Sequence, residues 1–174
     1  MADQSRLTWA LLVSLLLIEV NGSKQNNIVV TGIYDNFPPF RDDTPRCPPE
    51  ARYKALGQSR DGLIAWQSPD GLRWTRLGDQ PVIRQGAFDS QNVAFWSEAE
   101  QSYLLYFRVF TGGTVDEKKW QPKGYRTVSR ATSKDFLNWS EPQRMTFGDT
   151  PPEHLYTNAT HPYFRRSEEH TSEL

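Results

Sequence analysis

Residues 68–74 read Ser-Pro-Asp-Gly-Leu-Arg-Trp, and residues 133–139 read Ser-Lys-Asp-Phe-Leu-Asn-Trp. Both stretches fit the pattern S-x-D-x-x-x-W, and each follows a strand-forming run that contains alanine. Trp139 follows Trp74 by 65 residues, and a degraded third copy at residues 5–9 places Trp9 another 65 residues earlier. A fixed period of this size indicates supersecondary units that stack on each other or surround an axis.

Four short β-prone runs, rich in Tyr, Phe, Val and Ile, accompany each copy of the phrase. They span residues 37–41, 52–58, 62–67 and 75–83 in the first unit, and 92–96, 102–110, 125–132 and 140–147 in the second. Four antiparallel strands per unit, repeated around an axis, form the blades of a β-propeller. We therefore expect an all-β fold, a partial β-propeller with about two complete four-stranded antiparallel blades plus flanking strands.

The flanking strands of this prediction belong to neighbouring blades. Residues 27–31 are expected to form the outer part of a preceding blade, and residues 161–165 the first strand of a following one. No helix is predicted between residues 21 and 165. Because a closed propeller needs at least four blades, we expect the chain to be a fragment of a larger ring.

The repeated phrase is predicted to be a structural hairpin rather than a catalytic motif. Asp70 and Asp135 can accept hydrogen bonds from the N–H groups of a turn, and Gly71 tolerates a positive φ. Trp74 and Trp139 would each fill the seam between neighbouring blades, because large aromatic side chains contribute most when buried.

Composition excludes several classes of function. The chain has 174 residues with 20 basic and 21 acidic side chains, a net charge of −1, so no basic surface for nucleic acid is predicted. The single cysteine, Cys47, cannot form an internal disulfide, and its surroundings indicate neither a metal site nor an activated thiol. We predict no cofactor, no metal site and no membrane span.

The two ends of the chain are set apart from a partial propeller domain at residues 21–165. Residues 1–20 carry one early positive charge and an apolar run at 7–18, which indicates either a signal peptide or a miscalled start. A true signal peptide would make the protein secreted or periplasmic, and the run is too short for a confident membrane span. Residues 166–174 read like the translation of a sequencing-library adapter, and we expect them not to be native.

Further motifs carry a resemblance to a known superfamily. Residues 87–96 read AFDSQNVAFW, and residues 153–158 read EHLYTN, followed by HPY at 161–163. Together with the repeated phrase, residues 17–165 resemble the five-bladed β-propeller glycoside hydrolases of families 32 and 43, including bacterial members. The resemblance implies a five-bladed ring, a carbohydrate substrate and catalytic carboxylates at the start of the innermost strands, facing an axial funnel.

Carried over residue by residue, the resemblance implies three catalytic carboxylates. Asp89 stands before an inner strand where the family often has Asp-Pro, although Ser90 replaces the proline here. Asp35 holds the corresponding place in the previous blade, and Glu153 is the nearest candidate for a general acid. The alternative is that Asp89 and Asp35 cap turns and that Glu153 is a solvated loop residue.

The same resemblance implies a set of substrate-binding groups. Asn158 holds the inner-strand position of the next blade and would supply hydrogen bonds, while His154 and His161 would contact sugar. Arg108 lies in an otherwise apolar strand, where an unpaired charge is costly to bury. Arg108 therefore either pairs with a carboxylate in the funnel or extends outward to solvent.

Two functions follow from these residues, and the fold alone does not separate them. The first is hydrolysis of glycosidic bonds of oligo- or polysaccharides, with the fragment itself expected to be inactive. The second is a non-catalytic propeller that binds carbohydrate or protein through the same face. The discriminating feature is whether the carboxyl groups of Asp35, Asp89 and Glu153 converge.

Overall fold

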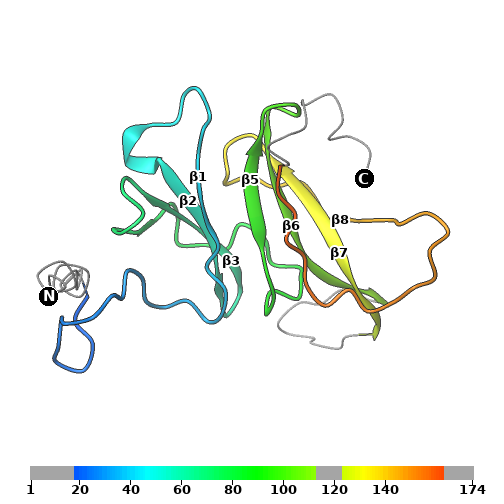
Figure 1. Cartoon of the computed structure of the whole chain (residues 1–174), viewed down its shortest axis with the longest axis horizontal. Coiled ribbons are helices and arrows are strands. Elements are labelled where there is room, and N and C mark those ends of the chain that lie inside the picture. Colours follow the sequence, from blue (N-terminus) through cyan, green and yellow to red (C-terminus); the bar gives the residue numbers. More distant parts are fainter. Residues whose placement is uncertain (1–17, 113–122, 163–174) are drawn as a thin grey trace, which may run out of the picture.

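The computed structural model describes residues 18–112 and 123–162, which form two four-stranded antiparallel sheets (Figure 1). Each sheet is a meander in which every strand pairs with the next strand along the chain. The prediction of an all-β fold with two four-stranded units is thus confirmed. The strands of the first sheet are β1 (Pro39–Arg41), β2 (Tyr53–Ser59), β3 (Gly62–Ser68) and β4 (Thr75–Arg76). Those of the second sheet are β5 (Val93–Ser97), β6 (Ser102–Gly112), β7 (Lys123–Ser133) and β8 (Gln143–Arg144).

The outer strands β4 and β8 are shorter than the predicted runs 75–83 and 140–147. After β4 the chain leaves the ladder at residues that include Pro81, which has no N–H to donate. It then rejoins β3, since Val82 N donates to Leu63 O at 2.8 Å and Leu63 N donates to Ile83 O at 2.9 Å. Gly62 permits this approach, because its φ is +133° and an added Cβ would lie 2.2 Å from Ile83 O.

The predicted strand at residues 27–31 is absent, and that prediction is wrong. Among the described residues no strand pairs with this segment to complete a ladder, and Val30 packs instead against the outer face of the first sheet. Residues 161–162 are likewise not in a strand, while residues 163–165 lie outside the described range, as do 1–17 and 166–174. A short 3-10 helix, η2 (Pro49–Ala51), precedes β2, where no helix was predicted.

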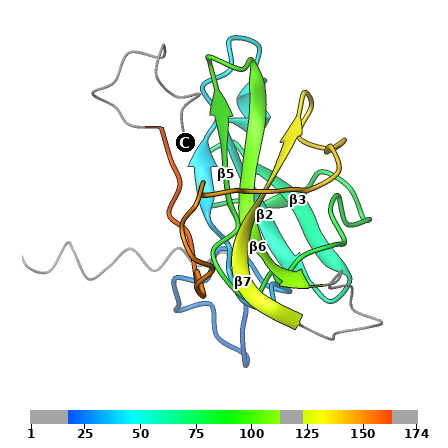
Figure 2. The same ribbon diagram turned by 90° about the vertical axis from the view of Figure 1, so that its right-hand side faces the viewer.

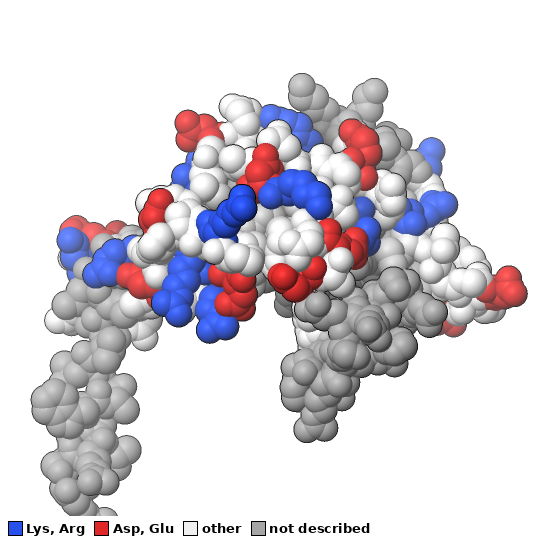
Figure 3. Space-filling model, turned by 90° about the horizontal axis from the view of Figure 1, so that it is seen from above, with Lys and Arg blue, Asp and Glu red and all other residues white. Residues whose placement is uncertain are grey.

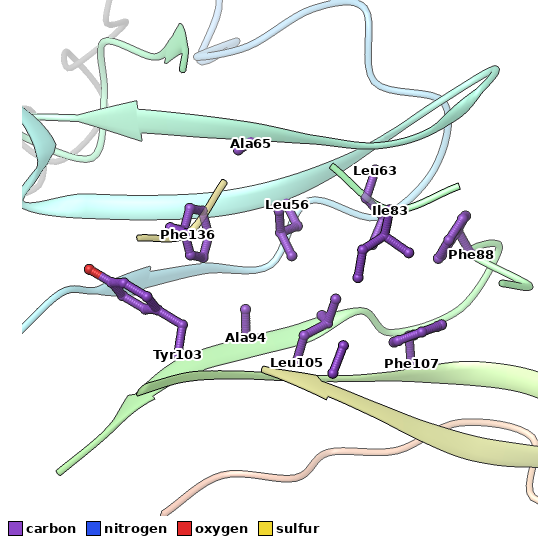
Figure 4. Packing of buried hydrophobic residues seen from close by; sticks show 11 residues of the cluster. Leu56, Leu63, Ala65, Ile83, Phe88, Ala94, Tyr103, Leu105, Phe107 and Phe136 are labelled. Carbon is purple, nitrogen blue, oxygen red and sulfur yellow. The ribbon is translucent and has the colours of Figure 1, made fainter. Parts of the chain in front are cut away.

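The main hydrophobic core lies between the two sheets (Figure 4). Side chains alternate across each strand, so that Leu56 of β2 points into this core while Ala55 faces the outer side of the first sheet. Leu105 and Phe107 of β6 close the core from the second sheet, and both are fully buried. The remaining buried members are Leu63, Ala65, Ile83, Phe88, Ala94, Tyr103, Ala131 and Phe136.

The first copy of the repeated phrase forms a tight turn that leaves β3. Oδ1 of Asp70 accepts hydrogen bonds from Leu72 N at 2.9 Å and Arg73 N at 2.8 Å. The hydroxyl of Ser68 accepts from Gly71 N at 2.9 Å, and Gly71 has a φ of +76°. The prediction that the phrase is a hydrogen-bonded structural turn is confirmed for this copy.

The second copy repeats the same bonds at the end of β7. Oδ1 of Asp135 accepts from Leu137 N at 2.9 Å and Asn138 N at 2.7 Å, and the Ser133 hydroxyl accepts from Phe136 N at 2.9 Å. Phe136 adopts a φ of +68° at the place where the first copy has glycine. Its side chain is fully buried between the sheets, and we infer that this burial offsets the backbone strain.

The two tryptophans of the phrase occupy equivalent faces of successive sheets. Trp139 packs against the core between the sheets, with its ring centroid 5.6 Å from that of Phe136. Trp74 packs on the outer face of the first sheet, 4.9 Å from Phe37. Trp139 therefore lies on the face of the second sheet that is turned toward the first sheet, and Trp74 lies on the face of the first sheet that is turned toward residues 30–37.

Replacing either turn aspartate by alanine is expected to lower the free energy of unfolding by about 1–2 kcal/mol, because several hydrogen bonds to turn N–H groups are lost together. Urea denaturation of Asp70→Ala and Asp135→Ala at pH 7 measures this loss. The exposed Asp79→Ala is the control, with an expected change below about 0.5 kcal/mol. An unchanged midpoint in both turn variants would show that the turns do not stabilise the sheets.

The same aspartates predict a pH dependence. Backbone hydrogen bonds from Arg73 and Leu72 lower the pKa of Asp70 to about 2. Burial raises the pKa of Asp135, but bonds from Asn138 and Leu137 outweigh it and bring the value to about 2. Since both values are depressed in the folded state, their stabilisation is present above about pH 4 and disappears as the pH falls toward 2. The alanine variants should lose less stability than the wild type over that interval.

Candidate functional site

Three irregular segments meet at the end of the molecule where β1 and β5 begin. The side-chain amide of Asn36, before β1, donates to Ser90 O at 2.9 Å. The buried Ser90 hydroxyl, before β5, lies 3.1 Å from Thr157 Oγ1 and 3.2 Å from Tyr156 O. Segments far apart in sequence are thus joined side by side at this end of the two sheets.

An ion pair between Asp89 and Arg108 lies at this junction. The Arg108 side chain on β6 is only 3% exposed, whereas that of Asp89 is 53% exposed. Nη1 of Arg108 also donates to Tyr156 O at 3.4 Å. Arg108 therefore pairs with a carboxylate and does not extend outward to solvent.

The residues around Asp89 explain why its carboxylate is presented to solvent. Phe88 is buried in the core between the sheets, Ala87 is buried against Phe110 in a separate cluster, and Ala87 N donates to Arg108 O at 2.8 Å. The fully buried Asn92 donates through its side-chain amide to Phe88 O at 2.8 Å. These hydrogen bonds fix the backbone before Asp89 and so hold Asp89 beside β6.

Asn158 ties the segment that follows β8 to the start of β5. Its side-chain nitrogen lies 3.2 Å from Gln91 O and 3.5 Å from Tyr106 O, while its Oδ1 accepts from Thr160 N at 3.4 Å. The predicted substrate-binding amide is therefore next to Asp89 in space, but its hydrogen-bonding groups already hold the backbone.

The other two predicted carboxylates, Asp35 and Glu153, lie in different surroundings. Asp35 is exposed beside Asn36 at the junction. Glu153 is exposed and lines a groove of about 700 Å³ that also contains Tyr125 and Phe147. Among the described residues, no hydrogen bond or ion pair joins Asp35, Asp89 and Glu153 to one another.

The two predicted histidines differ in their contacts. His154 accepts a hydrogen bond at Nδ1 from Arg126 N at 3.1 Å, and its ring centroid lies 5.1 Å from that of Tyr125. His161 is exposed, with Nδ1 2.8 Å from the carbonyl oxygen of Pro162. His154 thus anchors the crossing segment on β7, and His161 makes a local contact.

The registers of the two sheets shift the predicted equivalence of Asp35 and Asp89 by one residue. Pro39 and Ala94 hold matching places in the ladders, counted from the serine of the repeated phrase. Asp35 stands four residues before Pro39, so its counterpart is Ser90 rather than Asp89. The segments that lead into β1 and β5 form no ladder hydrogen bonds that would fix their length. The segment from Asp89 to Ala94 is therefore one residue longer than the segment from Asp35 to Pro39.

Two residues of this region were not assigned a role from the sequence. Tyr156 is 66% exposed and lies beneath two guanidinium groups, 5.4 Å from Arg108 and 5.5 Å from Arg126. Figure 2 looks onto this face of the second sheet, where the chain after β8 crosses in front of the strands. The signal available in the sequence was the presence of arginines within these two strands, Arg108 in β6 and both Arg126 and Arg130 in β7.

Cys47 lies beside η2. Its Sγ lies 3.2 Å from Ala51 O, and burial raises the pKa of the thiol. A raised pKa leaves little of the reactive thiolate at neutral pH. Within the described ranges, no cluster of three or more His, Cys, Asp or Glu side chains is arranged to hold a metal ion.

Charge on the surface is mixed in sign. Seen from above the view of Figure 1, basic and acidic side chains are interspersed (Figure 3). In the portion of the chain that the structure describes, no helix has the length and apolar character needed to cross a membrane. Comparisons with protein-family models, curated proteins and solved structures find no match for this chain.

Proposed function

We propose that the two sheets are adjacent blades of a five-bladed β-propeller, and that the protein is a glycoside hydrolase-like protein acting on oligo- or polysaccharides. Three features support the propeller. The sheets share one strand order, they end in the same hydrogen-bonded turn, and they pack face to face around a common core. The proposal also rests on the resemblance of residues 87–96 and 153–163 to that superfamily.

The observation that carries the function is the Asp89–Arg108 pair at the end where the inner strands begin. Glycoside hydrolysis needs one ionised carboxylate, as nucleophile or base, and one protonated carboxyl group as acid. Asp89 suits the first role, since a buried guanidinium fixes its orientation and matches its negative charge. Its half-exposed oxygens remain accessible to a sugar.

The acid must come from a second carboxyl group, and Glu153 and Asp35 are the proposed candidates. Both are exposed and free of ion pairs with the described residues, Asp35 at the junction and Glu153 in the neighbouring groove. Tyr156 offers a broad exposed ring beside Asp89, against which the apolar face of a sugar ring can pack.

A non-catalytic carbohydrate-binding propeller is the second candidate. It is favoured by the position of Glu153, which lines a separate groove whose lining includes neither Asp89 nor Arg108. In this case Asp89, Arg108 and Tyr156 would bind sugar through the same surface without a proton donor.

The test is a hydrolysis screen of the protein with its complete ring of blades, since the fragment alone is expected to be inactive. The screen uses aryl glycosides and oligosaccharides, with Glu153→Gln and Asp35→Asn beside the wild type. Loss of the general acid should slow oligosaccharide hydrolysis by about 10²–10⁴-fold, while activated aryl glycosides, whose leaving groups need no proton, react nearly normally. Binding without hydrolysis would select the second candidate. Neither binding nor hydrolysis would reject both.

A further inference from the structure

Arg126 on β7 carries a positive charge that no described carboxylate neutralises. Its neighbour Arg108 pairs with Asp89, whereas Arg126 forms no ion pair with any residue in 18–112 or 123–162. The Nε atoms of both arginines are buried and have no hydrogen-bond partner among the same residues. Two guanidinium groups thus lie against the exposed ring of Tyr156, and within the described ranges only that of Arg108 is paired with a carboxylate.

Aromatic contacts hold the Arg126 guanidinium in place. Its central carbon lies 5.6 Å from the ring centroid of Phe110 and 5.5 Å from that of Tyr156. The backbone of Arg126 also fixes the crossing segment, since its carbonyl oxygen accepts from Leu155 N at 3.0 Å. The tyrosine ring and the guanidinium are therefore positioned relative to each other before any ligand binds, which lowers the entropic cost of binding.

A guanidinium in this setting favours an anionic oxygen ligand. It presents planar N–H donors that match a carboxylate or sulfate, and such charge-assisted hydrogen bonds are stronger than neutral ones. Glu153 does not fill the role, because its side chain lines the neighbouring groove and makes no ion pair with Arg126. Asp89 is already engaged by Arg108.

We infer that Arg126 and Tyr156 form a subsite for an anionic sugar, one that carries a uronate carboxylate or a sulfate ester. The inference rests on the proposed carbohydrate function and specifies its substrate class. The sugar ring would lie on Tyr156, and its anionic group would pair with Arg126 on the side away from Asp89.

Calorimetric titration of the full chain with tri-galacturonate, with its methyl ester and with a sulfated galactose trisaccharide tests this subsite. The ester keeps the shape of the first probe and removes its charge. We expect one of the two anionic sugars to bind about tenfold or more tightly than the neutral ester, the difference a charge-assisted hydrogen bond supplies. The stronger of the two anions identifies the group.

Arg126→Gln should remove the preference for charge and leave ester binding unchanged, while Arg126→Lys should retain part of the preference. Arg46→Gln, an exposed arginine beyond the far end of β1, is the matched control. Equal binding of anionic and neutral sugars would overturn the anionic subsite alone. Absence of binding by every probe, with no glycoside hydrolysed, would overturn the carbohydrate function as well.

Discussion

Replacing Lys54 by methionine is expected to lower the free energy of unfolding by about 3–5 kcal/mol, because it leaves a buried carboxylate without its counter-charge. The Asp42 side chain is 0% exposed and that of Lys54 is 7% exposed, and the two form an ion pair. Tyr103 donates its hydroxyl to the same Asp42 oxygen at 2.6 Å. Methionine fills a similar volume, so the loss reports the charge rather than a cavity.

The double variant Lys54→Met/Asp42→Asn separates the ion pair from the packing around it. Removing both charges should recover most of the loss, since neither buried charge then lacks a partner. Urea denaturation of the two single variants, the double variant and the wild type gives the interaction free energy between Lys54 and Asp42. A double variant as unstable as Lys54→Met alone would contradict this explanation.

Asp42 also predicts the response of this pair to acid. Burial raises the pKa of Asp42, but hydrogen bonds from Lys54 and Tyr103 outweigh that effect and hold the pKa below its ordinary value. A depressed pKa in the folded state means stabilisation at neutral pH that is lost as the pH falls below the ordinary value near 4. The double variant should therefore show a flatter stability profile between pH 5 and pH 3.

Asp89→Asn is expected to reduce glycoside hydrolysis by about 10³-fold or more, because asparagine cannot act as nucleophile or base. The fold should survive, since Asp89 is half-exposed and an ion pair with one exposed partner contributes little stability. Initial rates on the substrate selected by the screen measure the loss. Asp61→Asn, an exposed residue at the β2–β3 hairpin, is the control and should keep the full rate. An unchanged rate in Asp89→Asn would remove this residue from the mechanism.

The sheets could be predicted because their signals are local in sequence. The Ser-x-Asp turn is built from bonds between residues two or three apart, and so it is visible in a seven-residue phrase. The lengths of β4 and β8 could not be predicted in the same way. They depend on where the chain leaves and rejoins β3 and β7, and Gly62 controls one such point through its contact with Ile83.

The candidate site was predictable only in part. An arginine in an apolar strand required a partner or an exit to solvent, and the sequence could not choose between them. The choice depends on the loop before β5, which brings Asp89 to Arg108 across 19 residues. The contacts of Arg126 with Tyr156 depend on how an irregular segment crosses the second sheet, and no periodic pattern encodes that path.

The most direct test of carbohydrate binding at the Asp89 end of the inner strands is an NMR titration of the isotope-labelled chain. Tri-galacturonate and its methyl ester serve as the probes. The account predicts the largest shifts at the amides of residues 89–91, at Arg108 and Arg126, and at residues 156–158. Shifts confined to the loop before η2, at the opposite end of the sheets, would contradict it.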